Sequence, residues 1–434
     1  MTPLWTPSAS RAARTHLAAF ARAASAAAGR PLDDYWALHA WSIAEPDAFW
    51  RTCLRESGLP YAGSAADGHD GAHAPAHDGA PMPATRWFAG VTVNYADALL
   101  AGRGATGDAA AIVATNEAAE DRVISRAGLR LAVGRAAAAL ARDGIGAGDT
   151  VAAFAANVPE AVILYLACAA RGAIFSSCSP DFGADAAYAR FHQIAPKLLL
   201  ASSSYPYNGK RFDTGKVVAD LAARLPGSPR VVVLGDAIAG LDAVAWADWL
   251  PGSSSPLAPE PLPFDHPLAV LYSSGTTGLP KALVHRAGGV LLKHHTELRL
   301  HGDIGSGDRL LYFTTCGWMM WNWLVSALAE GATIVLYDGS PSHPTLDVLW
   351  DAVDRLEVTH FGTSARFIHG CRAAGLVPSA GRRLERLRTV FSTGSPLART
   401  GFEWIYRDVK ADVHLASISG GTDIVGCFML GVPT

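Results

Sequence analysis

The stretch YSSGTTGLPKALVH, residues 272–285, combines the residue types that bind an anion. The members of its central loop have short hydroxyl side chains or no side chain: Ser273, Ser274, Gly275, Thr276, Thr277 and Gly278. Such residues let the backbone approach a charged ligand closely, and Lys281 adds a positive charge. Phosphate is therefore the ligand that this stretch favours.

The stretch differs from the P-loop of nucleotide hydrolases. That motif has glycine directly before its lysine and a hydroxyl residue directly after it, whereas Pro280 and Ala282 hold those places here. KALVH has the pattern of a second strand after LAVLY, not of a helix. The residues predict a strand, loop and strand that clamp phosphate. The alternative is a hairpin tip that binds nothing, but a plain turn needs only about two to five residues and no lysine.

Two glycine clusters follow predicted strands nearer the C-terminus. The strand LRTVFSTG leads into residues 394–396, and VHLASISG leads into residues 420–423. Glycines at strand ends let a flat ring or a phosphate approach the backbone, and Asp423 could hold Mg²⁺ against phosphates. Each cluster alone could be an ordinary turn. Their joint placement favours a ligand site.

The elements that position these residues read as an α/β fold. From about residue 108, helical and strand patterns alternate, which predicts two doubly wound, mostly parallel sheet halves that share a cleft. Ligands in such folds bind at the carboxyl ends of the strands. A proline- and serine-rich linker occupies about residues 251–267. We expect residues 1–107 to form an N-terminal helical cap and residues 108–434 to form the ligand-binding domain.

The cap contains two distinctive segments. Residues 33–58 are rich in tryptophan and predict packed helices, whereas residues 62–84 form a low-complexity insert. His69, His73 and His77 recur at spacings of four in that insert, but the glycines and prolines between them oppose a helical metal-binding face. We expect the insert to be disordered.

Composition limits the function classes. The 434 residues are half hydrophobic and carry a formal charge of −3, so no electrostatic footprint for nucleic acid or an anionic membrane exists. The apolar run AVILYLACAA is far shorter than the roughly 20 residues that a transmembrane helix needs. The six cysteines form no C-x-x-C pair, which predicts free thiols in a reducing cytoplasm and no disulfide framework or zinc site.

The N-terminal 32 residues contain arginines and no acidic residue, which is typical of a transit peptide. The same arginine- and alanine-rich usage continues along the whole chain, so a general compositional bias explains it equally well. We expect a cytoplasmic protein.

Four motifs together resemble the adenylate-forming superfamily, and within it the acetoacetyl-CoA synthetase family: YSSGTTGLPKALVH, FTTCGWMMWNWLVSALAEGATIVLYDGSP, FSTGSPL and SISGGTDIV. The segments PLWTPS and RWFAGVTVNYADALL extend the resemblance over nearly the whole chain apart from the insert. The long tryptophan-methionine motif is highly specific, whereas many acyl-activating enzymes share the threonine-glycine loop.

The resemblance implies a two-step reaction with the small-molecule substrates acetoacetate, ATP and CoA, assisted by Mg²⁺. It implies acyl-AMP formation followed by transfer to the CoA thiol. The loop from Ser273 to Lys281 would hold the β- and γ-phosphates of ATP. The adenine contacts that it implies are Gly394, Ser395 and Pro396.

The resemblance also assigns the remaining site residues. Thr422 would contact the phosphate region, and Asp423 stands where relatives use glutamate for the metal. Aspartate is one methylene shorter, which leaves direct metal contact open. The acyl pocket would include Trp318, Thr393 and Gly420. Most other aromatic and methionine residues of the long motif are expected to be core.

Two further positions bear on the choice of acid and on CoA binding. Acetyl-CoA synthetases resemble this chain but carry a tryptophan at the position of Gly420, so the missing indole would leave room for acetoacetate. Pocket size discriminates by only about 1–3 kcal/mol per methylene. Lys210, in YNGKR, falls where relatives hold the CoA 3′-phosphate, although a solvated lysine on a turn explains it equally well.

The resemblance also sets an expectation for the end of the chain. The ribose-binding aspartate, the hinge and the C-terminal lid with its catalytic lysine have no counterpart within residues 1–434. We therefore expect a fragment or an incomplete reading frame that binds Mg·ATP weakly and has little turnover. Two alternatives stay open: a ligase for another short-chain acid such as acetate or propionate, and a lidless nucleotide-binding remnant.

Overall fold

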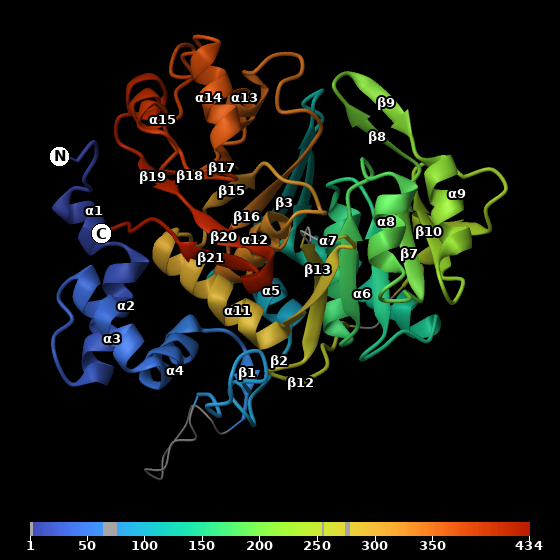
Figure 1. The fold of residues 1–434 in the computed structure, drawn as a ribbon, viewed down its shortest axis with the longest axis horizontal. Coiled ribbons are helices and arrows are strands. Elements are labelled where there is room, and N and C mark those ends of the chain that lie inside the picture. The colour runs from blue at the N-terminus through green and yellow to red at the C-terminus, as the bar shows by residue number, and fades with distance from the viewer. Residues whose placement is uncertain (1–2, 64–75, 254–255, 274–277) are drawn as a thin grey trace.

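Two seven-stranded sheets form the centre of the molecule (Figure 1). The structure is a computed structural model that describes residues 3–63, 76–253, 256–273 and 278–434. Both sheets are parallel except for one antiparallel pair at an edge of each. The predicted α/β class, with two doubly wound halves, is confirmed.

The first sheet takes its strands from the middle of the chain. In spatial order they are β11 (Ala243–Ala245), β10 (Arg230–Leu234), β7 (Leu198–Ser202), β5 (Thr150–Phe154), β6 (Ile174–Cys178), β13 (Pro267–Ser273) and β14 (Lys281–Arg286). The accompanying helices are α6 (Arg126–Arg142), α7 (Pro159–Ala170), α8 (Ala184–Phe191), α9 (Gly215–Arg224) and α10 (Trp246–Trp249). Strand β7, of sequence LLLAS, is buried at every residue, as expected where helices cover both faces of a parallel sheet.

The second sheet lies mostly in the C-terminal part of the chain. In spatial order its strands are β19 (His414–Ser417), β18 (Thr389–Thr393), β17 (His360–Ser364), β15 (Arg309–Tyr312), β16 (Thr333–Asp338), β3 (Ala110–Asn116) and β4 (Arg122–Ser125). Its helices are α12 (Met319–Ser326), the 3-10 helix η2 (Ala327–Glu330), α13 (Val348–Arg355), α14 (Ala365–Ala373), α15 (Arg399–Trp404) and the π-helix η3 (Ile405–Val409).

Each sheet includes a hairpin that the order of the chain would assign to the other sheet, and the sequence pattern did not predict this. The β3–β4 hairpin precedes the whole first sheet in the chain but joins the edge of the second. The linker near residues 251–267 does not divide the sheets, because β13 and β14 follow it and complete the first sheet. Pairing across a sheet edge depends on contacts distant in sequence, which a local pattern does not encode.

Smaller elements complete the fold. Short strands form three further sheets: β1 (Tyr61–Ala62), β2 (Thr92–Val93) and β12 (Leu262–Pro263); β8 (Ser204–Tyr207) and β9 (Lys210–Asp213); and β20 (Ser419–Gly421) and β21 (Gly426–Met429). The remaining helices are α1 (Ala9–Ala13), α2 (His16–Ala28), α3 (Tyr35–Ala44), α4 (Pro46–Ser57), α5 (Tyr95–Ala101), α11 (Ala287–His295), the π-helix η1 (Thr296–His301) and the 3-10 helix η4 (Thr422–Ile424).

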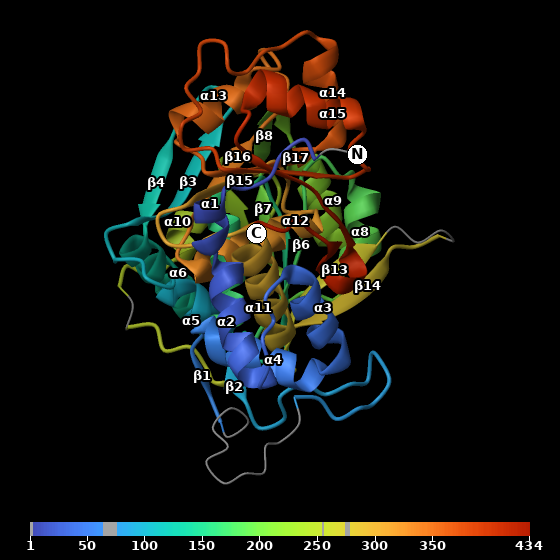
Figure 2. The ribbon, with the colours of Figure 1, turned by 90° about the vertical axis from the view of Figure 1, so that its left-hand side faces the viewer.

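The N-terminal helices pack beside α11 and η1 (Figure 2). The helices predicted for residues 33–58 are present as α3 and α4. In the insert, His77 forms an isolated antiparallel β-bridge with Trp87, whereas His69 and His73 lie outside the described residues. The described helices are all too short or too polar to traverse a lipid bilayer.

Candidate functional site

The predicted clamp is built on an antiparallel strand pair. Strand β13 ends at Ser273 and β14 begins at Lys281, and these two residues pair directly across the ladder. The strand-loop-strand prediction is therefore confirmed at both ends of the loop. Ser274, Gly275, Thr276 and Thr277 lie outside the described residues. Gly278 has a left-handed φ of 134° that favours glycine, and Lys281 is exposed.

Two hydrogen bonds from the first half fix the base of this loop. The hydroxyl of Tyr272 donates to the backbone oxygen of Arg190 at 2.9 Å. The side-chain amide of Gln193 donates to the backbone oxygen of Pro280 at 2.9 Å. The residues on either side of the loop are thus held by the same segment, at the end of α8.

The second predicted cluster reaches the clamp through tertiary contact. The short helix η4, which holds Thr422 and Asp423, lies against β13. Asp423 is exposed, whereas His285 on β14 is buried. Burial lowers the pKa of His285, although the Thr422 backbone and the Asp423 carboxylate act in the opposite direction. A neutral imidazole and an exposed carboxylate therefore lie together beside the loop.

A buried ionic network holds the β20–β21 hairpin, from which η4 projects. The carboxylate of Glu297 pairs with Lys293 at 2.7 Å and accepts hydrogen bonds from the Cys427 backbone at 3.0 and 3.1 Å. It also accepts a bond from the Trp323 indole at 2.9 Å. Burial raises the pKa of Glu297, and these partners act to lower it. Sequence reasoning missed this network, whose only local signal is the i,i+4 spacing of Lys293 and Glu297.

A second brace on the hairpin is neutral. His294 is fully enclosed, and one ring nitrogen lies 2.5 Å from the backbone oxygen of Val425. The other ring nitrogen lies 2.7 Å from the Ser326 hydroxyl. Burial lowers the pKa of His294 to about 3, so the ring is neutral near pH 7. Helix α11 therefore fixes the hairpin by both charged and neutral contacts.

Gly420 has close backbone neighbours that a pocket-size argument does not anticipate. A Cβ at this position would lie 2.0 Å from the backbone oxygen of Gly426 and 2.6 Å from the Cα of Cys427. Any side chain here would press into β21. The expectation that an added indole would simply fill an empty pocket is therefore not supported by the geometry, because the hairpin must move first.

The third predicted cluster lies beside this hairpin. Gly394 follows β18 with a left-handed φ of 86°, and Ser395 and Pro396 are exposed. The hydroxyl of Thr393 donates to the backbone oxygen of Ile418 at 3.2 Å, one residue before β20. The structure thus brings the candidate adenine contacts next to the strand that carries Gly420.

The long tryptophan motif divides as the sequence predicted. Trp318 is 66% exposed at the start of α12, whereas Trp321 and Trp323 are fully buried. The indole of Trp321 donates to the Asn157 side chain at 3.0 Å. Trp318 is therefore the tryptophan of this motif that is available to a ligand.

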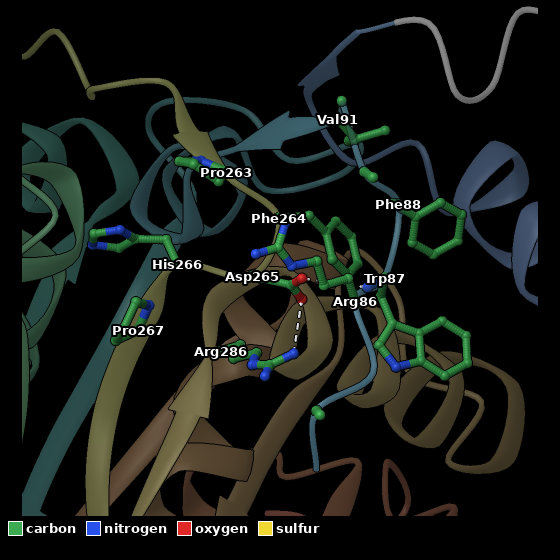
Figure 3. A pocket seen from close by; sticks show the side chains of 13 residues that line it. Arg86, Trp87, Phe88, Val91, Pro263, Phe264, Asp265, His266, Pro267 and Arg286 are labelled. Atoms are coloured by element: carbon green, nitrogen blue, oxygen red, sulfur yellow. Dashed lines mark hydrogen bonds and ion pairs between the residues drawn. The ribbon is translucent and has the colours of Figure 1, made fainter. Parts of the chain in front are cut away.

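Some of the predicted site residues line a cavity, but the larger cavity of the molecule lies elsewhere. Asp423, His285 and Lys293 line an apolar cavity of about 400 Å³ together with Val284 and Ile424. A larger cavity of about 710 Å³ lies between residues 84–91 and 263–267 (Figure 3). Its residues include the ion pair of Asp265 and Arg286 at 3.2 Å, but no described member of the predicted site.

Lys210 is separate from the other predicted residues. It begins β9 and lines a cavity of about 490 Å³ with Glu117, Tyr205 and His343. This cavity lies where the β8–β9 hairpin of the first half meets loops of the second. The predicted site residues therefore line two separate cavities, one beside η4 and one at this hairpin.

Comparisons with a protein family, with related proteins and with a solved structure bear on the site. The chain matches the AMP-binding enzyme family over residues 102–433. It is 46% identical to acetoacetyl-coenzyme A synthetase of Rhizobium meliloti, with 99% of this chain and 66% of the relative covered. It is 40% identical to acetoacetyl-CoA synthetase of Mus musculus, with 98% and 64% covered. The solved structure of acetoacetyl-CoA synthetase from Streptomyces lividans matches with a TM-score of 0.93 at 40% identity, covering 100% of this chain and 67% of that chain. The chain thus spans about two thirds of the length of each of these proteins.

Proposed function

Because the chain belongs to the AMP-binding enzyme family, we propose that it activates acetoacetate with ATP and passes the acyl group to CoA. A carboxylate oxygen of acetoacetate attacks the α-phosphorus of ATP, which forms acetoacetyl-AMP and releases pyrophosphate. The CoA sulfur, after losing its proton, then attacks the acyl carbon, which forms acetoacetyl-CoA and releases AMP. The identity of 46% to an acetoacetyl-CoA synthetase over nearly the whole chain supports this substrate.

The first step brings a carboxylate to a polyanion, so positioning and electrostatics dominate its barrier. The loop between Ser273 and Lys281 holds the β- and γ-phosphates in this proposal. The fixed base of the loop supports the assignment, because hydrogen bonds at Tyr272 and Pro280 hold both ends of the loop in place. Thr422 contacts the phosphate region from η4.

Asp423 is the proposed ligand of Mg²⁺. Its carboxylate is exposed beside the loop, and carboxylate oxygen together with phosphate oxygen is the donor set that Mg²⁺ prefers. When bound, the metal would neutralise phosphate charge. The chain's own contribution is to hold Asp423 in place through the braced hairpin.

The other substrate contacts follow the strand ends. Gly394, Ser395 and Pro396 contact adenine in this proposal, since the exposed turn leaves its backbone open to a flat ring. Trp318, Thr393 and Gly420 form the acyl pocket, and Lys210 holds the 3′-phosphate of CoA. Burial of all six thiols supports a reducing compartment, which we propose is the cytoplasm.

The convergence of η4, β13 and the turn after β18 carries this proposal, because it joins three motifs that are distant in sequence. The test is calorimetric titration of the chain with non-hydrolysable acyl-sulfamoyl adenosines that carry acetoacetyl, acetyl or propionyl groups. We expect the acetoacetyl compound to bind at least tenfold more tightly than the other two. Tighter binding of the acetyl or propionyl compound would favour another short-chain acid, and no binding of any compound would refute the proposal.

A further inference from the structure

The β8–β9 hairpin has a tight turn whose two backbone N–H groups point away from its own ladder. Tyr207 pairs with Lys210, so Asn208 and Gly209 form a two-residue turn. Both have left-handed φ values, 55° and 71°, which is the geometry of an Asn-Gly hairpin. In such a turn these N–H groups need acceptors from elsewhere.

Glu117, from the other half of the molecule, supplies those acceptors. It follows β3 of the second sheet, and its carboxylate accepts hydrogen bonds from the Asn208 backbone at 2.5 Å and the Gly209 backbone at 2.8 Å. It also accepts a bond at 2.5 Å from the backbone of Ser340, just after β16. One carboxylate thus joins the tip of a first-half hairpin to two loops of the second half. Figure 1 labels β3, β8, β9 and β16, the strands next to these segments.

Two glycines without side chains leave the space that Glu117 and His343 occupy at this contact. A Cβ at Gly339 would lie 2.2 Å from the Cγ of Glu117, and one at Gly209 would lie 2.6 Å from the His343 ring. Burial acts to raise the pKa of Glu117, but the three N–H groups and His343 outweigh it and lower the pKa. The carboxylate is therefore ionised near pH 7, when it accepts hydrogen bonds most strongly.

We propose that Glu117 is a positioning residue that latches the β8–β9 hairpin and so places Lys210 for the phosphate-bearing end of CoA. The inference rests on the proposed function for its ligand. Lys210 directly follows the latched turn and lines the same cavity as Glu117, and its side-chain ammonium group forms no hydrogen bond or ion pair with another described residue. Its ammonium group is free for a ligand, but its position depends on the hairpin.

Simple electrostatics predicts the opposite effect of removing Glu117. A negative charge in a cavity that binds phosphate weakens binding, so its neutralisation should strengthen binding. Loss of a latch should weaken it. Glu120 is a matched control, because it lines the same cavity but accepts its side-chain bond from Asn116 at 2.9 Å, not from the hairpin.

The experiment compares wild type, Glu117→Gln, Glu120→Gln and Lys210→Ala, titrated with CoA and with 3′-dephospho-CoA. We expect wild type to prefer CoA, and Lys210→Ala and Glu117→Gln each to lose at least fivefold in CoA affinity. Glu120→Gln should bind CoA as tightly as wild type or more tightly. Equal gains in affinity for the two glutamine variants would overturn the latch.

Amide hydrogen exchange tests the latch without any ligand. Glu117→Gln should speed exchange at Asn208, Gly209 and Ser340 by at least tenfold, because their acceptor is replaced in part by an amide N–H₂ group. Glu120→Gln should leave these rates unchanged. Unchanged rates in Glu117→Gln would refute the latch. If wild type does not distinguish CoA from 3′-dephospho-CoA, the assignment of Lys210 fails, while the exchange rates still decide the role of Glu117.

Discussion

Two hairpins carry candidate ligand contacts, and the protein holds them by different means. The β20–β21 hairpin presents Thr422 and Asp423. Hydrogen bonds to Lys293 and His294 of α11 and to Glu297 of η1 brace it. The β8–β9 hairpin presents Lys210 and is held at its tip by the half-buried carboxylate of Glu117. The first hairpin is therefore integrated with the core, whereas the tip of the second is tied to the other half through the Glu117 carboxylate.

Rigidity is distributed unevenly around the proposed site. A buried carboxylate with three donors is costly to disrupt, because each unpaired buried group loses its solvation as well as its partner. A latch made of backbone N–H groups near the surface can open without disturbing the core. We expect the phosphate side of the site to be fixed and the CoA side to be adjustable.

The strongest test of this contrast is Glu297→Ala. It removes the partner carboxylate of Lys293 and leaves the Cys427 N–H and the Trp323 indole without their acceptor, so we expect a loss of about 3–5 kcal/mol in unfolding free energy. Urea denaturation measures it. Glu403→Ala is the control, because its i,i+4 pair with Arg399 is solvent-exposed and should cost about 0.5 kcal/mol. Equal losses in the two variants would contradict a buried brace.

Gly420→Ala should produce the next largest effect. Its Cβ would meet the backbone oxygen of Gly426 at 2.0 Å, so we expect a loss of about 3 kcal/mol and weaker binding of Mg·ATP. Gly421→Ala is the matched control on the same strand, because its nearest neighbour is Asp423 Oδ2 at 3.9 Å. Thermal unfolding with and without Mg·ATP measures both. A fully stable Gly420→Ala variant would show that the hairpin is less constrained than we infer.

Acidification should weaken the braced hairpin through His294. Its pKa is about 3 in the folded protein and about 6.5 when unfolded, so its contribution to stability is present above pH 6.5 and is lost as the pH falls toward 3. The loss is about 2 kcal/mol by pH 5. Denaturation of wild type and His294→Gln between pH 7.5 and 5 measures the slope. The variant should show the shallower slope, and identical slopes would argue against a neutral buried ring.

Lys281→Ala should change stability least and ligand binding most selectively. The side chain is exposed, so unfolding free energy should stay within about 0.5 kcal/mol of wild type. Loss of a charge-assisted phosphate contact should weaken Mg·ATP binding by about tenfold, measured by calorimetry. The exposed Lys216→Ala variant should bind normally. Unchanged affinity in Lys281→Ala would remove this residue from the proposed clamp.

Local sequence patterns predicted the elements well and their partners less well. The alternation of apolar runs and helical segments gave two parallel sheet halves, and the segment between Ser273 and Lys281 was correctly expected to connect two strands. The exchange of β3–β4 and β13–β14 between sheets was not expected. The neighbour of an edge strand is determined by packing against residues far away in the chain, and a single sequence does not show which neighbour that is.

The residue types available for chemistry, and the strand ends at which they stand, can be read from the amino-acid sequence alone. The positive φ values at Gly278, Gly394 and Gly209 depend on the local sequence, because glycine adopts this backbone conformation without strain. Tertiary structure alone decided which of these ends meet, why Gly420 excludes a side chain, and that Glu117 binds a turn about ninety residues away. The physical reason is that hydrogen-bond satisfaction and close packing are properties of the assembled fold, since a donor's acceptor is fixed only when both segments are in place.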